Sequence, residues 1–199
     1  MYQFIETICY EHGLFRRLDL HNERCNRTRL HFFGLQPDIR IELHLAIPPP
    51  LINETVKCTL TYGIDILSIE YVAYKIRPLN SLQIVVDDTI NYAFKYADRS
   101  GLTKLLEKRG QDDDILIVKN GLLTDISYAN IIYLYKNKWY SQQNPLLFGT
   151  RLQHYLKEGR ITPALLTPED LPKFTEARII NAMISIEESP VIPVNAIHF

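Results

Sequence analysis

One lysine, Lys95, stands where an extended segment gives way to a helix, which makes its amine the first candidate for chemistry. The run 81–94 is rich in Val and Ile and predicts a strand, and the residues after the lysine predict a helix that Ser100 caps and Gly110 ends. A lone lysine is most often a solvated surface residue. An amine held at a strand end inside a cleft would instead have a lowered pKa and could act as a nucleophile or Schiff-base former.

Two further features could hold a phosphate group. His21 and Arg24 are three residues apart in a predicted helix, so their side chains share one face. Gly149 and Thr150 precede another predicted helix, whose N-terminus offers free amides and a hydroxyl to an anion. Taken alone, each feature has an ordinary explanation, an exposed arginine in the first case and a helix cap in the second.

An acid and an amide enclose a tight turn between two predicted strands, because Asp125 and Asn130 are the ends of the sequence DISYAN. Together with the lysine and the phosphate donors, they match what pyridoxal 5'-phosphate requires. That cofactor needs an amine for its imine, a carboxylate that keeps its pyridine nitrogen protonated, and an arginine with further donors for its phosphate.

Composition excludes several other classes of protein. Of the 199 residues, 46% are hydrophobic and 23% are charged, which is ordinary for a globular protein. A formal net charge of -1 gives no electrostatic case for binding nucleic acid or an anionic membrane. No apolar run approaches the roughly 20 residues that a membrane helix requires.

Motifs for other chemistry are missing from the sequence. The histidines show no metal-ligand spacing, so we expect no metal site. The glycines form neither a dinucleotide-binding loop nor a Walker loop. Cys9, Cys25 and Cys58 lack C-x-x-C spacing, and the N-terminus has no basic region of a secretory signal, so we expect a reduced, cytoplasmic protein. The acidic run 112–114 is interpreted as a solvated loop without a functional role.

The pattern of elements predicts an α+β chain of two subdomains. In the first, residues 1–90, a strand over 2–11 is followed by a helix that Asp19 caps and Gly34 ends, and then by three β-rich segments. The second, residues 91–199, carries the two later helices among further β segments. We expect a small N-terminal layer pair and a C-terminal β-rich pseudo-barrel with helices, with the cofactor in the cleft between them.

Six segments of the chain follow one another in a recognisable order: FIETICYEHG, LHNERCNRT, KYADR, GLLTDISYANIIYLYKNKWYS, LLFGTRLQ and ARIINAMISIEESPVIPV. They are similar to the opening strand, H-x-x-R-L helix, lysine segment, T-E-x-x-x-x-N strand pair, G-I-T-R phosphate loop and closing strand of the class IV aminotransferases. These fold-type IV pyridoxal-phosphate enzymes include branched-chain and D-amino-acid transaminases and aminodeoxychorismate lyase. The resemblance covers nearly the whole chain.

The resemblance implies a set of site residues. It makes Lys95 the Schiff-base lysine and adds Asp125 and Thr7 as catalytic residues. The implied cofactor-binding residues are Arg24, Lys95, Asp125, Asn130, Gly149, Thr150, Asn181 and Ala182.

The sequence departs from the family pattern in three places. Asp125 stands where the family usually carries glutamate, which is one methylene longer. The phosphate loop reads G-T-R-L, so either Thr150 or Arg151 could contact the phosphate. The first subdomain begins at the opening strand, so we expect a homodimer in which a second subunit supplies part of the substrate wall.

Two details favour the lyase within this family. KYADR resembles the lyase's K-H-x-N-R, and IINAMI resembles its N-A-L-M strand, where transaminases carry T-G-T or S-G-T. The implied substrate is a small amino compound, 4-amino-4-deoxychorismate, which the lyase converts to 4-aminobenzoate and pyruvate. The alternatives are an amino-acid transaminase of the branched-chain or D-amino-acid type and a pyridoxal-phosphate-binding homologue without turnover.

Overall fold

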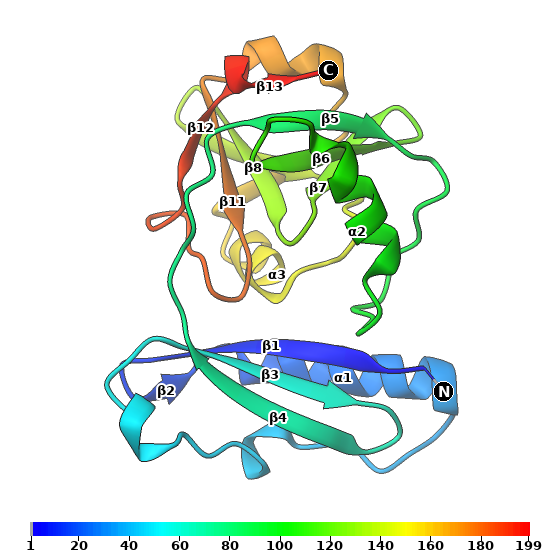
Figure 1. The fold of residues 1–199 in the computed structure, drawn as a ribbon, viewed down its shortest axis with the longest axis vertical. Helices are drawn as coiled ribbons and strands as arrows, with labels where there is room; N and C mark the ends of the chain where they lie inside the picture. The colour runs from blue at the N-terminus through cyan, green and yellow to red at the C-terminus, as the bar shows by residue number, and fades with distance from the viewer. Residues whose placement is uncertain (1) are drawn as a thin grey trace. The chain divides into compact units, whose positions relative to one another are not determined.

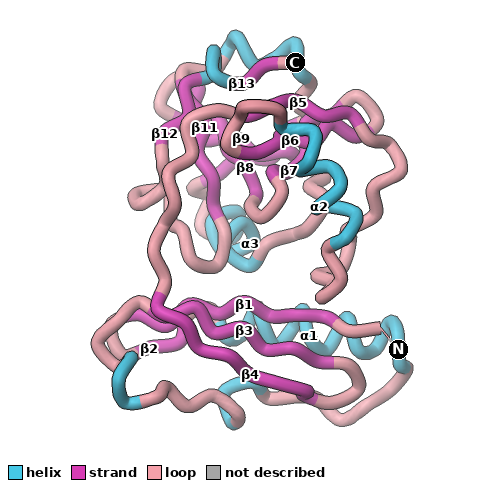
Figure 2. The backbone as a smooth tube through the Cα atoms, in the orientation of Figure 1, coloured by secondary structure: helices cyan, strands magenta, loops and turns pink. Residues whose placement is uncertain are grey.

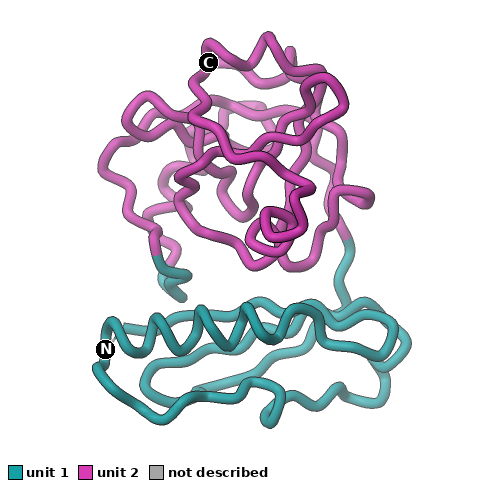
Figure 3. Tube along the Cα trace, turned by 180° about the vertical axis from the view of Figure 1, so that it is seen from behind, with its two compact units in different colours: residues 1–75, 94–98 teal, residues 76–93, 99–199 magenta. Residues whose placement is uncertain are grey.

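The computed structural model describes residues 2–199, which divide into two compact units (Figure 3). Of the described residues, unit 1 comprises 2–75 and Phe94–Asp98, and unit 2 comprises Ile76–Ala93 and Arg99–Phe199. This division differs from the expected boundary between residues 90 and 91 in two ways. Residues 82–86, expected in the first subdomain, pair with a strand of unit 2. The segment 94–98, expected in the second subdomain, pairs with a strand of unit 1.

Unit 1 is an antiparallel sheet with one α-helix along it (Figure 1). Within the described residues the sheet has four strands in the order β2-β1-β3-β4. The elements are β1 (Phe4–Glu11), β2 (Leu14–Phe15), α1 (Leu18–Phe33), the 3-10 turns η1 (Ile41–Leu43) and η2 (Pro49–Leu51), β3 (Val56–Tyr62) and β4 (Ile66–Ala73). The core of this unit is formed by buried side chains of β1, α1, η1 and β3: Phe4, Ile8, Cys25, Ile41, Cys58, Leu60 and Tyr62.

Helix α1 ends where the sequence predicts and begins differently. Gly34 follows the last turn with a φ of 76°, a left-handed conformation that glycine adopts without a steric penalty. At the other end the capping position is Arg17, whose φ is 55°, and Asp19 lies in the first turn. The negative charge of an acid in the first turn is attracted by the positive end of the helix dipole, so Asp19 stabilises the helix without capping it.

Unit 2 is built on one mixed sheet, whose strands are drawn in magenta in Figure 2. In the described part of the chain this sheet has nine strands. Its path is β10-β9-β8-β7-β6-β5-β13, and β11 pairs with both β8 and β12. The strands are β5 (Leu82–Val86), β6 (Asp114–Lys119), β7 (Leu122–Ile126), β8 (Asn130–Tyr135), β9 (Lys138–Gln142), β10 (Ile161–Ala164), β11 (Glu176–Ile180), β12 (Val191–Pro193) and β13 (Ile197–His198). The helices are α2 (Ser100–Leu106), η3 (Glu107–Arg109), α3 (Thr150–Lys157), η4 (Pro168–Lys173) and η5 (Val194–Ala196).

The expected start of one helix in unit 2 is corrected, because Ser100 is the first residue of α2 and Arg99 occupies the capping position. The strands β8 and β9 form a hairpin, in which Lys136 and Asn137 both have positive φ and reverse the chain. Strand β11 ends at Ile180, and a turn follows it.

The expected α+β class is confirmed, and the described residues form two separate sheets. Among residues 2–199, no helix has the length and apolar character needed to cross a membrane.

Candidate functional site

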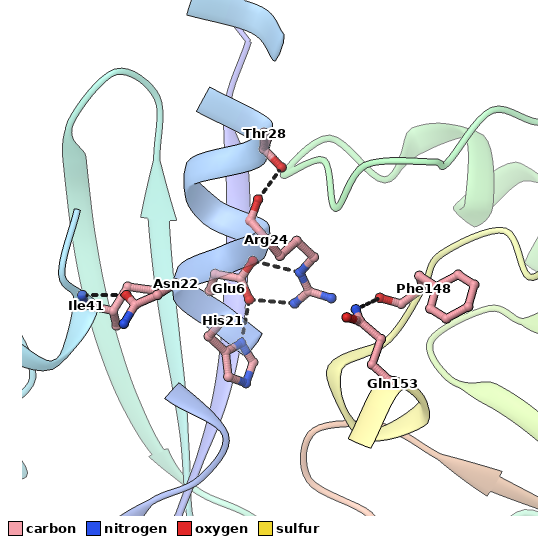
Figure 4. Close-up of polar contacts among 8 residues, drawn as sticks. All are labelled: Glu6, His21, Asn22, Arg24, Thr28, Ile41, Phe148 and Gln153. Atoms are coloured by element: carbon pink, nitrogen blue, oxygen red, sulfur yellow. Dashed lines mark hydrogen bonds and ion pairs between the residues drawn. The ribbon is translucent and has the colours of Figure 1, made fainter. Parts of the chain in front are cut away.

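Unit 1 contains a buried ion pair between β1 and α1 (Figure 4). Arg24 donates from Nε to Oε1 of Glu6 at 2.8 Å and from Nη2 to Oε2 at 2.5 Å. Nδ1 of His21 lies 2.6 Å from the same Oε2. Because the guanidinium meets the carboxylate through two parallel bonds, Glu6 fixes the orientation of Arg24.

Burial and the neighbouring charges together set the pKa values of Glu6 and His21. Burial alone would raise the pKa of Glu6, but the charge of Arg24 and the hydrogen bonds from Arg24 and His21 lower it to about 2. Burial lowers the pKa of His21 against the opposing influence of Glu6, so the imidazole is neutral at pH 7 and donates its Nδ1 proton to the carboxylate. The net charge of the cluster is therefore set by one arginine and one glutamate.

Glu6 is a residue of this cluster that the sequence analysis missed. It shares one face of β1 with the buried residues Phe4 and Ile8. An acid on the apolar face of a strand, followed by an H-x-x-R helix, is a signal for a buried ion pair that could have identified it.

Lys95 lies on a segment that runs beside β1 within unit 1. The carbonyl oxygen of Lys95 accepts a hydrogen bond from the Ile5 amide at 2.9 Å, and the next residue, Tyr96, forms an isolated antiparallel bridge with Phe4. The side chain of Lys95 is half-buried. Thr7, the pocket threonine implied by the resemblance, is half-buried on the same strand β1.

Aromatic rings hold the lysine segment on both sides of Lys95. The ring of Tyr96 lies 5.3 Å from that of Phe4, and the ring of Phe94 lies 4.9 Å from that of Phe32 near the end of α1. Offset and edge-on aromatic pairs add favourable energy beyond the area they bury. The backbone position of the lysine is therefore fixed by unit 1.

In unit 2, Asp125 faces Asn130 across the strands β7 and β8. Oδ1 of Asp125 accepts a bond from Nδ2 of Asn130 at 2.8 Å, and Oδ2 accepts one from the Leu147 amide at 2.9 Å. Burial raises the pKa of Asp125 to about 7, although the hydrogen bonds from Leu147 and Asn130 act in the opposite direction. This acid therefore changes its charge near neutral pH.

The N-terminus of α3 begins directly after Gly149, as the sequence predicts. A Cβ atom at position 149 would lie 2.3 Å from Oδ1 of Asn130, so a larger residue there would force the Asn130 side chain to move. Thr150, the first helical residue, is buried. Backbone amides at the start of a helix and a hydroxyl such as that of Thr150 are suitable donors for an anion.

Arg151 connects α3 to the turn after β11. It donates from Nε to the carbonyl oxygen of Asn181 at 2.8 Å and from Nη2 to that of Ala182 at 3.1 Å. The Asn181 side chain accepts the amides of Met183 and Ile184, which shapes the same turn. Because these contacts direct Arg151 towards backbone carbonyls, they favour Thr150 as the residue that could contact a phosphate.

Within the acidic run, the interpretation as a solvated loop is wrong for Asp114. Its side chain is 0% exposed, and it accepts bonds from Arg77 at 2.7 Å and from the hydroxyl and amide of Ser127 at 2.9 and 3.1 Å. Ser127 is two residues after Asp125, so Asp114 anchors the β7–β8 turn that carries the candidate acid.

The candidate residues thus fall into two groups. Unit 1 carries Lys95, Arg24 and Thr7. Unit 2 brings Asp125, Asn130, Gly149 and Thr150 together, and it places Asn181 and Ala182 against Arg151.

Comparisons with known proteins agree on one fold. No family model matches the chain. An uncharacterized protein of Haemophilus influenzae is 36% identical over 185 residues, which are 92% of this chain and 98% of that protein. The crystal structure of a provisionally assigned 4-amino-4-deoxychorismate lyase from Haemophilus somnus 129pt is 29% identical with a TM-score of 0.85, and the match covers 92% of this chain and 97% of that one.

A more distant likeness extends to a cofactor-bound structure. The pyridoxal-phosphate-bound form of a hypothetical aminotransferase from Mycobacterium tuberculosis has a TM-score of 0.73 at 12% identity, over 96% of this chain and 80% of that one, and so shares the fold. These matches show that the chain is a homologue of the Haemophilus influenzae protein and has the fold of the provisionally assigned lyase and of the aminotransferase.

Proposed function

We propose that this protein is a pyridoxal-phosphate-dependent enzyme that acts as an aminodeoxychorismate lyase. The observation that carries the proposal is the likeness to the Haemophilus somnus protein, which is 29% identical and matches over 97% of its own length. The lysine segment KYADR and the turn after β11 support the lyase over a transaminase, because both resemble the lyase pattern.

The residues of the chain are suited to hold the cofactor. Lys95 would bind the aldehyde carbon through Nζ. Arg24 is suited to bind a phosphate, and so are the Thr150 hydroxyl and the α3 amides. Asp125 would meet the ring nitrogen. A carboxylate can accept about four hydrogen bonds, so Asn130 and Leu147 leave capacity on Asp125 for a ring N–H. When bound, the cofactor supplies an electron sink for negative charge that develops at the substrate's amine-bearing carbon.

Two side chains would act on protons in the reaction, Lys95 on a proton of the substrate and Asp125 on the proton of the ring nitrogen. The Lys95 amine would remove the proton from the amine-bearing carbon of the substrate. The bond between the ring and the ether oxygen of the three-carbon group breaks, the ring becomes aromatic, and the proton is returned to the three-carbon product, pyruvate. The negative charge of Asp125 would keep the proton on the ring nitrogen throughout.

An amino-acid transaminase is the second candidate. It is supported by the shared fold of the Mycobacterium tuberculosis aminotransferase. A transaminase would use the same lysine, acid and phosphate contacts, so the substrate is what separates the two activities. A cofactor-binding protein without turnover is the third candidate, supported by the aspartate in place of the family's glutamate.

The test is an assay of the purified protein with 4-amino-4-deoxychorismate, beside a panel of amino acids paired with 2-oxo acids. The lyase predicts 4-aminobenzoate and pyruvate in equal amounts, and no product from Lys95→Ala. Transfer of amino groups without 4-aminobenzoate would identify a transaminase, and cofactor binding without either product would identify the binder. We further propose a homodimer, which sedimentation of the same preparation would test.

A further inference from the structure

We propose that Asn130 is a positioning residue that locks the Asp125 carboxylate to the start of α3. It would do this instead of contacting the cofactor itself. The inference rests on the proposed function only for the identity of the group that Asp125 meets.

Asn130 uses both of its amide hydrogens inside unit 2. Nδ2 donates to Oδ1 of Asp125 at 2.8 Å and to the carbonyl oxygen of Leu147 at 2.8 Å. The amide of Leu147 donates in turn to Oδ2 of Asp125 at 2.9 Å. These bonds close a ring of three residues, in which each carboxylate oxygen has its own donor. An amide group has two hydrogens, so Asn130 has none left for a ligand.

The amide oxygen of Asn130 is covered as well. It lies so close to Gly149 that a Cβ atom there would approach it to 2.3 Å. Asn130 itself is 6% exposed. Its side chain therefore contacts the acid, the loop before α3 and the residue that begins α3, all within one buried cluster.

This arrangement gives Asn130 a specific effect on the acid. Aspartate has one methylene fewer than glutamate, so the position of its carboxylate depends closely on its backbone and on its hydrogen-bond donors. The donor from Asn130 also favours the charged form of Asp125 against the effect of burial. Loss of this donor should reduce the charge on the acid and loosen the start of α3 together.

The test uses Asn130→Leu, which keeps the shape of the side chain and removes its polar atoms. The matched control is Gln142→Met in the same sheet. Gln142 is also buried, and its Nε2 donates to the carbonyl oxygens of Leu123 and Leu166 and to no carboxylate. Both variants lose a buried amide, so a loss of stability in urea is expected from both and does not distinguish them.

The distinguishing measurement is the carboxyl NMR titration of Asp125 in the protein without cofactor. We expect the acid dissociation constant of Asp125 to fall about tenfold in Asn130→Leu, the size of one lost charge-assisted hydrogen bond. Gln142→Met should leave it unchanged. An unchanged constant in a folded Asn130→Leu protein would overturn the inference.

A second variant covers the case in which Asn130→Leu does not fold. Gly149→Ala leaves Asn130 chemically intact but pushes its side chain away from residue 149. The same fall in the Asp125 dissociation constant is expected, and its absence would also contradict the inference. If the NMR result holds while the wild-type protein binds no pyridoxal phosphate, the proposed function fails and the positioning role stands.

Discussion

The amide nitrogen of Ile5 lies 2.9 Å from the carbonyl oxygen of Lys95, so the candidate lysine is bonded to β1. The flanking segments Ile76–Ala93 and Arg99–Phe199 belong to unit 2. The lysine is therefore held by the unit that also carries Arg24 and Thr7, although its neighbours in the chain lead into the other unit.

Lys95 is the residue that we expect to bind pyridoxal phosphate covalently. Reduction of the cofactor-loaded protein with borohydride, followed by peptide mass spectrometry, should place a phosphopyridoxyl group on Lys95. Lys104 and Lys108 are exposed lysines of α2 and η3 and serve as internal controls. Modification of those two residues alone, or equal labelling of wild type and Lys95→Ala, would refute the assignment.

Arg24 should contribute to cofactor affinity beyond its contribution to folding. A hydrogen bond to a charged group contributes roughly 1.5–3 kcal/mol, so Arg24→Met should weaken binding of pyridoxal phosphate about ten- to a hundredfold in a fluorescence titration. The matched control is Arg29→Met on the same helix. Arg29 is equally buried, and its guanidinium donates to the carbonyl oxygens of Ile64 and Pro37.

Both arginine variants should lower the free energy of unfolding, because each removes buried hydrogen bonds. Arg24→Met leaves Glu6 buried without its main partner, and breaking a buried ion pair in this way costs about 3–5 kcal/mol. Urea unfolding measures this loss separately from the affinity. Equal cofactor affinity in wild type and both variants would leave Arg24 with a structural role only.

Asp125 should make the stability of the cofactor-free protein depend on pH. Burial raises its pKa from 3.8 to about 7 in the folded state. The folded chain thus binds this proton more tightly than the unfolded chain. The contribution of Asp125 to the free energy of unfolding is therefore full below pH 3.8 and is lost as the pH rises through about 7.

The variant Asp125→Asn lacks this titration. Its free energy of unfolding, relative to that of the wild type, should therefore rise between pH 5 and pH 8 in a series of urea titrations. A difference that stays constant across this range would mean that the acid is not titrating there.

Asp125 should also be required for proton removal from the substrate. Asp125→Asn keeps the size of the side chain but loses the charge that favours a protonated ring nitrogen. Cofactor attachment to Lys95 should persist in this variant, whereas exchange of the substrate's amine-adjacent proton, followed by NMR in D₂O, should slow by orders of magnitude. Asp125→Glu, which restores the family's usual residue, should retain part of the exchange rate. Equal rates in wild type and Asp125→Asn would show that this acid does not act on the ring.

Local sequence patterns were sufficient to predict much of the secondary structure of unit 1, but they did not predict its buried ion pair. The alternation in β1 and the glycine after α1 identify those elements, because each depends on residues that are close in sequence. The pairing of Glu6 with Arg24 depends on how a strand and a helix pack, 18 residues apart. Spacing within the helix shows which side chains share a face but not which acid they meet.

The buried role of Asp114 shows the same limit more strongly. In the sequence it is the third acid of a polar run, which is typical of a surface loop. Its partners Arg77 and Ser127 are 37 and 13 residues away, and they meet it because β5 pairs in parallel with β6 while β6 pairs with β7. A parallel pair joins segments through a long connection, so its register does not follow from any local pattern.

The return of Phe94–Asp98 to unit 1 has a consequence for how the chain folds as it is made. The strands β1, β3 and β4 leave the ribosome first, but the acceptor for the Ile5 amide is Lys95, which is synthesised after β5 of the other unit. A nascent chain halted after residue 75 would carry the sheet and α1 without this last pairing. The N-terminal unit therefore cannot complete its pairing until the chain has been made beyond Lys95, and no single proteolytic cut can release it intact.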